Sequence, residues 1–176
     1  IDVERRSLDA QAGTDLLTVI GVEGTDEHIT VRASATPGSG SVQTPSTHLS
    51  FVRLEDVTVR GNSGDGDTLA FYGTAAADDF AINPVAQGTA DSVVASLGNG
   101  FGSTLLRLRD FSHVGIPTFF GGPGADTFRV TVFPTTPEFA IRSVRLNGGT
   151  ERPGARTAVD TLIMNYNESL FTQLSP

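Results

Sequence analysis

The chain has 176 residues, a hydrophobic content of 38%, no cysteine and a formal net charge of −8. That length suits a single domain over residues 1–176 with one continuous core. The missing cysteine excludes disulfides and thiolate metal sites. All twelve basic residues are arginines, spread without a basic cluster, so we expect no nucleic-acid partner. No run of about 18 apolar residues is present, so we expect no membrane insertion.

Alternation of apolar and polar residues is the main pattern along the chain. It occurs at "FVRLEDVTVRG" (residues 51–61), "TLLRLRDF" (104–111) and "DTFRVTVF" (126–133). A period of two is typical of a strand with one buried face, whereas no stretch of about twelve residues has helical spacing. Twenty glycines and nine prolines favour frequent turns between these strands.

An internal repeat joins several of these segments. Asp15 and Asp67 each precede an alternating run, and six residues after each stands a glycine, Gly21 or Gly73. Acidic pairs at 26–27 and 78–79 then precede a second run, and partial copies begin at Asp126 and Asp160. Because the spacing between copies is irregular, we expect insertions. The candidate loop insertions are residues 33–50 and 83–100, which are rich in glycine, proline and serine.

This repeat predicts a solenoid. Two short strands are marginally stable alone, but stacked units bury their apolar faces in continuous rows. We therefore predict an all-β fold, a right-handed parallel β-helix with irregular loop insertions. A β-sandwich is the alternative, although it gives no reason for a recurring Gly and Asp corner.

The segments "GGPGADTF" and "DTLAFYGTAAADDFAIN" resemble the Gly/Asp repeats of bacterial extracellular β-solenoid proteins. These include the repeats-in-toxin family and long surface proteins with similar repeats. The resemblance implies an extracellular or cell-surface location.

Calcium is the first chemistry to consider. Residues 121–129 fit the nonapeptide GGxGxDxUx of calcium-binding β-rolls, and Asp126 stands at the ligand position that the resemblance implies. A Ca²⁺ ion needs about six to eight oxygen ligands, but no second full nonapeptide adjoins this one. The other interpretation is a turn in which aspartate accepts backbone N–H groups. No cofactor is predicted to be required, and the calcium candidates are Asp65, Asp67, Asp78, Asp79 and Asp126.

Catalysis is not predicted. A catalytic interpretation would align Asp67 and Asp126 on neighbouring coils as a carboxylate pair of the kind that cleaves polysaccharides. Both, however, occupy the repeating corner, where a structural role already accounts for them. The three histidines, His28, His48 and His113, lack the spacing of metal ligands. The arginines on strands are expected to form outward rows that pair with acids on neighbouring coils.

Assembly is the function that the sequence favours. A solenoid has two open ends whose strand edges must be capped or used. We predict an extracellular structural or adhesive module that self-assembles end to end or by exchange of a terminal strand. Its partners would be copies of itself, neighbouring repeats of a longer chain, or polysaccharide. The alternative is a carbohydrate-binding or polysaccharide-cleaving parallel β-helix.

Overall fold

The computed structural model describes residues 4–61, 66–84, 93–98, 103–109, 117–131, 144–149 and 160–165. The regular elements in these ranges are all strands, which confirms the all-β prediction. No membrane-spanning helix is found in the described part of the chain. The strands are β1 (Glu4–Asp9), β2 (Leu16–Ile20), β3 (His28–Ala33), β4 (Gly40–Gln43), β5 (Thr47–Val52), β6 (Asp56–Arg60), β7 (Thr68–Tyr72), β8 (Asp79–Pro84), β9 (Val93–Gly98), β10 (Ser103–Arg109), β11 (Thr118–Phe120), β12 (Thr127–Thr131), β13 (Arg145–Asn147) and β14 (Thr161–Asn165).

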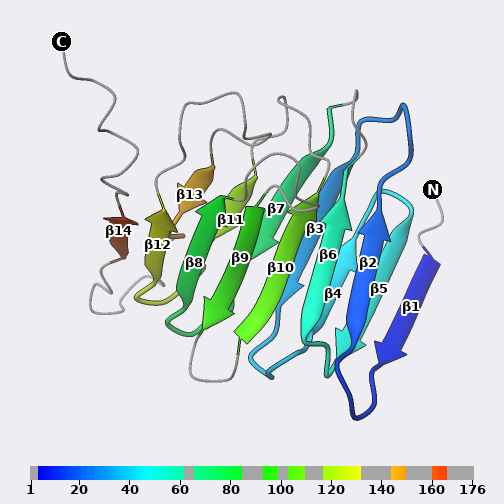
Figure 1. The fold of residues 1–176 in the computed structure, drawn as a ribbon, viewed down its shortest axis with the longest axis horizontal. Coiled ribbons are helices and arrows are strands. Elements are labelled where there is room, and N and C mark those ends of the chain that lie inside the picture. Colours follow the sequence, from blue (N-terminus) through cyan, green and yellow to red (C-terminus); the bar gives the residue numbers. More distant parts are fainter. Residues whose placement is uncertain are drawn as a thin grey trace.

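The strands form two seven-stranded sheets (Figure 1). Sheet A has the order β1-β5-β4-β3-β7-β11-β13, and sheet B has the order β14-β12-β8-β9-β10-β6-β2. Neighbouring strands are parallel except where β4 or β9 takes part. As a result, β1 and β2 lie at one end of the molecule, and β13 and β14 lie at the other end.

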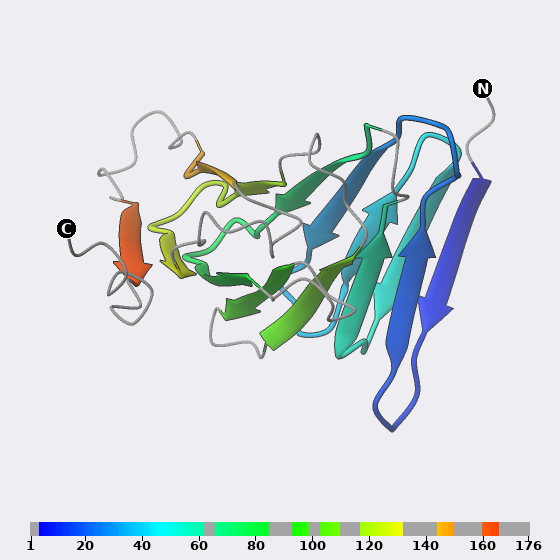
Figure 2. The same ribbon diagram turned by 45° about the horizontal axis from the view of Figure 1, so that its top comes forward.

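The chain alternates between the sheets, with one interruption in each (Figure 2). Single strands are placed in turn in A and B, but β3, β4 and β5 all stay in sheet A, and β8, β9 and β10 all stay in sheet B. Each of these runs is an antiparallel meander that leads the chain back toward β1 and β2. The meanders therefore bring β5 beside β1 and β10 beside β6.

Two expectations from the sequence need correction. Residues 33–50 and 83–100 were expected to be loops, yet they contain β4 with the start of β5, and β9. The short runs around Val42 and Val94 provide the β-branched residues that a strand favours, although glycine and serine surround them. In addition, the strands that follow Asp15 and Asp67 are not equivalent in the fold, because β2 lies in sheet B and β7 lies in sheet A. The repeating unit is thus one strand and one turn.

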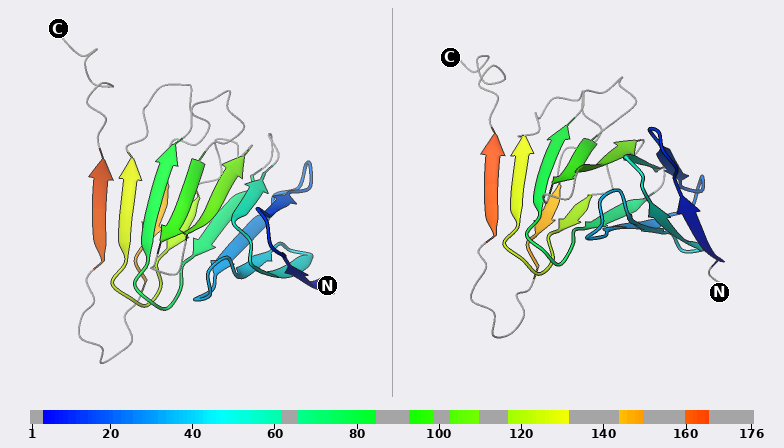
Figure 3. Two further views of the ribbon diagram at one scale, coloured as in Figure 1. Left: turned by 60° about the horizontal axis from the view of Figure 1, so that its bottom comes forward. Right: turned by 90° about the horizontal axis from the view of Figure 1, so that it is seen from below.

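The two sheets face each other (Figure 3). Rows of apolar side chains from both sheets form a single core between them. In sheet A the register aligns Val31, Phe71, Phe119 and Leu146, and in sheet B it aligns Phe80, Phe128 and Leu162. The Phe80 ring meets Phe71 edge-on at 5.9 Å and stacks on Phe128 at 4.9 Å between ring centroids. This aromatic contact joins the two sheets at the middle of the molecule.

The fold class is thus settled at the level of two facing, mostly parallel sheets. Strands that pass in turn from one sheet to the other are typical of a flattened solenoid. Two facing sheets that each contain an antiparallel meander are also compatible with a β-sandwich.

Removal of the Phe80 ring tests this description of the core. Phe80 is fully buried and contacts three other phenylalanine rings, so Phe80→Ala should lower the free energy of unfolding by about 3–5 kcal/mol. The measurement is urea denaturation followed by circular dichroism. Leu16→Ala is the control, because Leu16 is 60% exposed and should change stability by no more than about 0.5 kcal/mol. Equal losses in the two variants would contradict the assignment of Phe80 to the core.

Candidate functional site

Three aspartates form a ladder where the chain passes from sheet A to sheet B. The Asp126 carboxylate accepts the backbone N–H of Asp78 at 2.9 Å, and the Asp160 carboxylate accepts that of Asp126 at 3.1 Å. In the other direction, the N–H groups of Thr127 and Thr161 donate to the carbonyls of Asp78 and Asp126. The recurring Asp-Thr pair therefore links successive turns by hydrogen bonds. Aspartate supplies an acceptor to the preceding turn, and threonine supplies a donor to it.

Glycine makes room for these carboxylates. A Cβ on Gly121 would lie 2.6 Å from Cγ of Asp126, and a Cβ on Gly73 would meet the Asp78 carboxylate in the same way. Gly122 adopts φ of 98°, in the left-handed region that glycine favours. The motif "GGPGADTF" is thus explained: Gly121 leaves space, Gly122 allows the turn, and the buried Asp126 carboxylate binds the preceding turn at Asp78.

A second acidic ladder stands where the chain passes from sheet B to sheet A. Here the Asp67 carboxylate accepts the Glu27 N–H, and the Thr68 N–H donates to the Glu27 carbonyl, both at 2.8 Å. Glu27 also accepts the N–H of Val22 at 2.6 Å, as Asp78 accepts that of Thr74 at 2.6 Å. The Glu27 turn has one more residue than the Asp78 turn, and the longer glutamate side chain spans the difference.

The predicted site residues are therefore divided between two edges. Asp78 and Asp126 meet on one edge, whereas Asp67 lies on the opposite edge, separated from them by the length of β7. The hypothesis of a carboxylate pair made by Asp67 and Asp126 does not fit this placement. Asp79 lies beside Asp78, but its side chain pairs with Arg129 at 2.9 Å, as expected for the arginine rows.

No group of three or more metal-ligating side chains is assembled within the described residues. Asp65 lies outside them, and calcium binding stays a prediction. Among the histidines, Nδ1 of His28 is hydrogen-bonded to Oγ1 of Thr68 at 2.7 Å. His113 lies outside the described residues.

Exposed apolar side chains gather at the two ends of the sheets. Leu162 and Met164 on β14 are 56% and 48% exposed, although they continue the inward rows of Phe128 and Val130. The others lie at the opposite end, on β1, β2 and β5 or in the turn after β2: Leu8, Leu16, Ile20, Val22 and Val52. The ends of the sheets are therefore the apolar surfaces of the described part of the chain.

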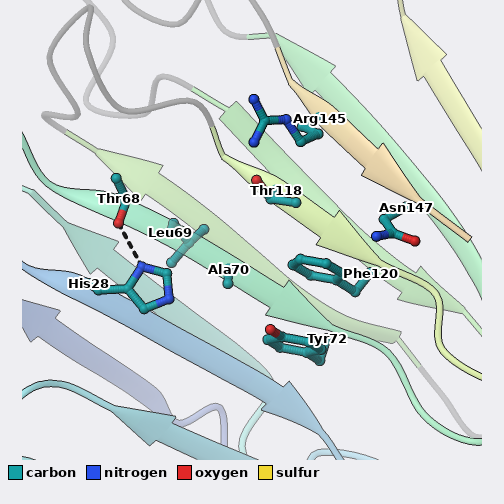
Figure 4. Close-up of a pocket in the computed structure, with 9 residues that line it drawn as sticks. All are labelled: His28, Thr68, Leu69, Ala70, Tyr72, Thr118, Phe120, Arg145 and Asn147. Atoms are coloured by element: carbon teal, nitrogen blue, oxygen red, sulfur yellow. Dashed lines mark hydrogen bonds between the residues drawn. The ribbon is translucent and has the colours of Figure 1, made fainter. Parts of the chain in front are cut away.

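A groove of about 650 Å³ lies on the outer face of sheet A, across β3, β7, β11 and β13 (Figure 4). Polar and aromatic side chains surround the small Ala70 at its centre. The alternation of each strand predicts which residues share a face, but the register between strands brings them together, and the sequence gives no direct signal for it. The lining residues are His28, Thr68, Leu69, Ala70, Tyr72, Thr118, Phe120, Arg145 and Asn147.

Comparison with known proteins adds no family to this description. No family model, curated protein or solved structure matches the chain.

The space at Gly121 can be tested directly. Gly121→Ala should lower the free energy of unfolding by about 1–3 kcal/mol, because the added methyl group overlaps the buried Asp126 carboxylate. Chemical denaturation measures the loss. Gly66→Ala is the control, since its Cβ would meet only the Asp26 carboxylate at 3.1–3.2 Å, on an exposed residue that can move aside. A Gly121→Ala variant as stable as the control would show that the glycine is not needed for the turn.

Proposed function

We propose that this chain is an extracellular or cell-surface structural module, adhesive in character, which associates end to end through its outermost strands. We further propose that its two sheets are the faces of a flattened, right-handed β-solenoid into which two antiparallel meanders are inserted. The proposed location rests on the resemblance of the Gly and Asp repeats to those of bacterial extracellular solenoids.

Support for the solenoid comes from the turns. The same exchange of hydrogen bonds occurs at Asp78 with Asp126, at Asp126 with Asp160, and at Glu27 with Asp67. Turns that stack in register and bond to one another are what successive coils require. A sandwich whose strands are joined by hairpins has no need of equivalent turns at both edges. Parallel strands joined by a crossover are right-handed in nearly all proteins, which supports the handedness.

The observation that carries the proposed association is the exposure of Leu162 and Met164. Both side chains point to the core side of β14, where the preceding coil has Phe128 and Val130, which are 3% and 7% exposed. A further strand paired with β14 would cover Leu162 and Met164, as β12 covers the core-facing side chains of the strands beside it. Full burial of a leucine side chain is worth about 1.5–3 kcal/mol, which adds to the backbone hydrogen bonds that a further strand would form with β14.

The opposite end has a matching geometry. All strands of sheet A except β4 are parallel to β1, and all strands of sheet B except β9 are parallel to β2. The β1 and β2 edges of one copy can therefore continue the parallel pairing beyond β13 and β14 of another copy. This contact is heterologous and does not close on itself, so it produces filaments rather than symmetric dimers.

Catalysis is not part of the proposal. The acidic residues that recur along the described chain accept backbone N–H groups in the turns, a role that accounts for their position without any reaction. The carbohydrate-binding alternative has one observation of its own, the groove on the outer face of sheet A.

Charge placed on β14 tests the association. The double variant Leu162→Lys with Met164→Lys should raise the concentration needed for association at least about tenfold, because each ammonium group would be buried at the contact. Sedimentation velocity over a wide concentration range, with negative-stain microscopy for filaments, provides the measurement. Thr161→Lys is the control, since this exposed residue belongs to the outward row that contains Thr127 and Asp79. A wild-type chain that stays monomeric throughout, or a control that dissociates equally, would overturn the proposal.

A further inference from the structure

The groove on the outer face of sheet A is lined by basic and neutral side chains. The chain carries a net charge of −8, yet none of the described residues that line the groove is acidic. Arg145 and His28 line the groove, and Arg32 lies beside it with its guanidinium carbon 3.9 Å from the centre of the Tyr72 ring. An acidic protein that gathers basic groups on one hollowed face provides a local site for an anion.

The arrangement of the two arginines indicates the size of the ligand. Arg32 lies on β3 and Arg145 on β13, with β7 and β11 between them, so they are three strand spacings apart. At about 4.8 Å per spacing the separation across the sheet is about 14 Å. An extended chain that carries repeated negative charges spans this separation, whereas one small anion would require both side chains to reach toward each other.

The aromatic side chains indicate how that chain is recognised. Tyr72 and Phe120 are stacked at 4.4 Å and 6° between ring planes, and Arg32 covers the other face of Tyr72. The stack runs from strand to strand, so the rings present their edges to solvent. Ring edges carry partial positive charge, and neither face of Tyr72 is open to the apolar side of a sugar ring, because Phe120 and Arg32 cover them. Recognition would therefore depend on charge and hydrogen bonds.

The remaining lining groups favour a sugar chain over a peptide. Thr68, Thr118 and Asn147 place hydroxyl and amide groups around Ala70, where they can bond the hydroxyls of a sugar (Figure 4). Within the groove the backbones of β3, β7, β11 and β13 pair with one another. A peptide held by strand addition needs a free sheet edge, which this face does not provide.

We propose that the groove on the outer face of sheet A binds an acidic polysaccharide, a sugar chain that bears carboxylate groups. Arg145 binds one carboxylate through its guanidinium group, and Arg32 binds another toward β3, while the polar side chains between them contact sugar hydroxyls. The inference deepens the adhesive part of the proposed function by naming the class of partner, and it rests on that part alone. It does not require association of the ends.

The test is a titration of the full chain with oligogalacturonate, measured by calorimetry and repeated at increasing salt. Arg145→Gln and Arg32→Gln should each weaken binding about tenfold or more, since each removes one charged contact. Added salt should weaken binding to the wild-type chain. Arg129→Gln is the matched control, because it makes the same charge change on sheet B, where Arg129 pairs with Asp79, and it should bind like wild type. All three variants should keep the wild-type melting temperature, because the replaced side chains are exposed.

Several results would overturn the inference. These are no binding of oligogalacturonate, equal binding of a neutral glucan, equal binding of polyglutamate, or an equal loss of affinity in Arg129→Gln. The Leu162→Lys and Met164→Lys double variant separates this site from the ends. If the double variant is monomeric and still binds oligogalacturonate, the groove is supported whatever the outcome for the end contacts. If the chain associates but does not bind oligogalacturonate, the groove is rejected and the end contacts are not.

Discussion

The hydrogen bond between a buried carboxylate and the backbone N–H of the neighbouring turn is the interaction on which this fold depends. A strand that leaves one sheet for the other must turn through a corner where backbone donors lose their sheet partners. Buried donors without partners cost about 1–3 kcal/mol each, so a stack of corners needs an acceptor at every level. Asp126 and Asp67 supply one at opposite edges, where they are 0% and 3% exposed.

The same interaction accounts for the composition of the chain. A carboxylate inside a corner needs space, which glycine leaves by having no side chain, as Gly121 does for Asp126. Acids and glycines therefore occur together because one makes the other possible. The buried Asp126 and Asp67 carboxylates each accept a backbone N–H from a neighbouring turn, so an acidic chain can hold them inside the corners. In the described turns, aspartate and glycine thus occur together for a structural reason.

Sequence alone was sufficient for several of the strands and for two of the corners. Alternation identified β6, β10 and β12, and the recurrence of Asp-Thr after glycine identified the turns at Asp126 and Asp160. These features are local, and each is visible within about ten residues. One interpretation of the sequence had Asp126 accept backbone N–H groups within its own turn. The structure instead shows its carboxylate accepting the N–H of Asp78 in the preceding turn, 48 positions earlier in the chain.

Features that depend on pairing between distant residues could not be predicted. Neither β4 nor β9 has a long alternating run, and each is held by two antiparallel neighbours that only the folded chain provides. The alignment of Asp15 with Asp67 matched the local pattern but missed that the two strands belong to different sheets. The groove escaped notice for the same reason, since Tyr72 and Phe120 are 48 positions apart and become neighbours through the pairing of β7 with β11.

The antiparallel meanders also determine where the molecule can change length. From β11 onward each pair of strands completes a circuit by itself, so another pair placed after β14 would leave every existing contact unchanged. Between β3 and β10 this freedom is lost, because β5 and β10 return to partners placed earlier, and an added strand would separate them. Strand pairs can therefore be added at one end of this architecture but not in its centre, which makes the central block of strands the part of fixed length.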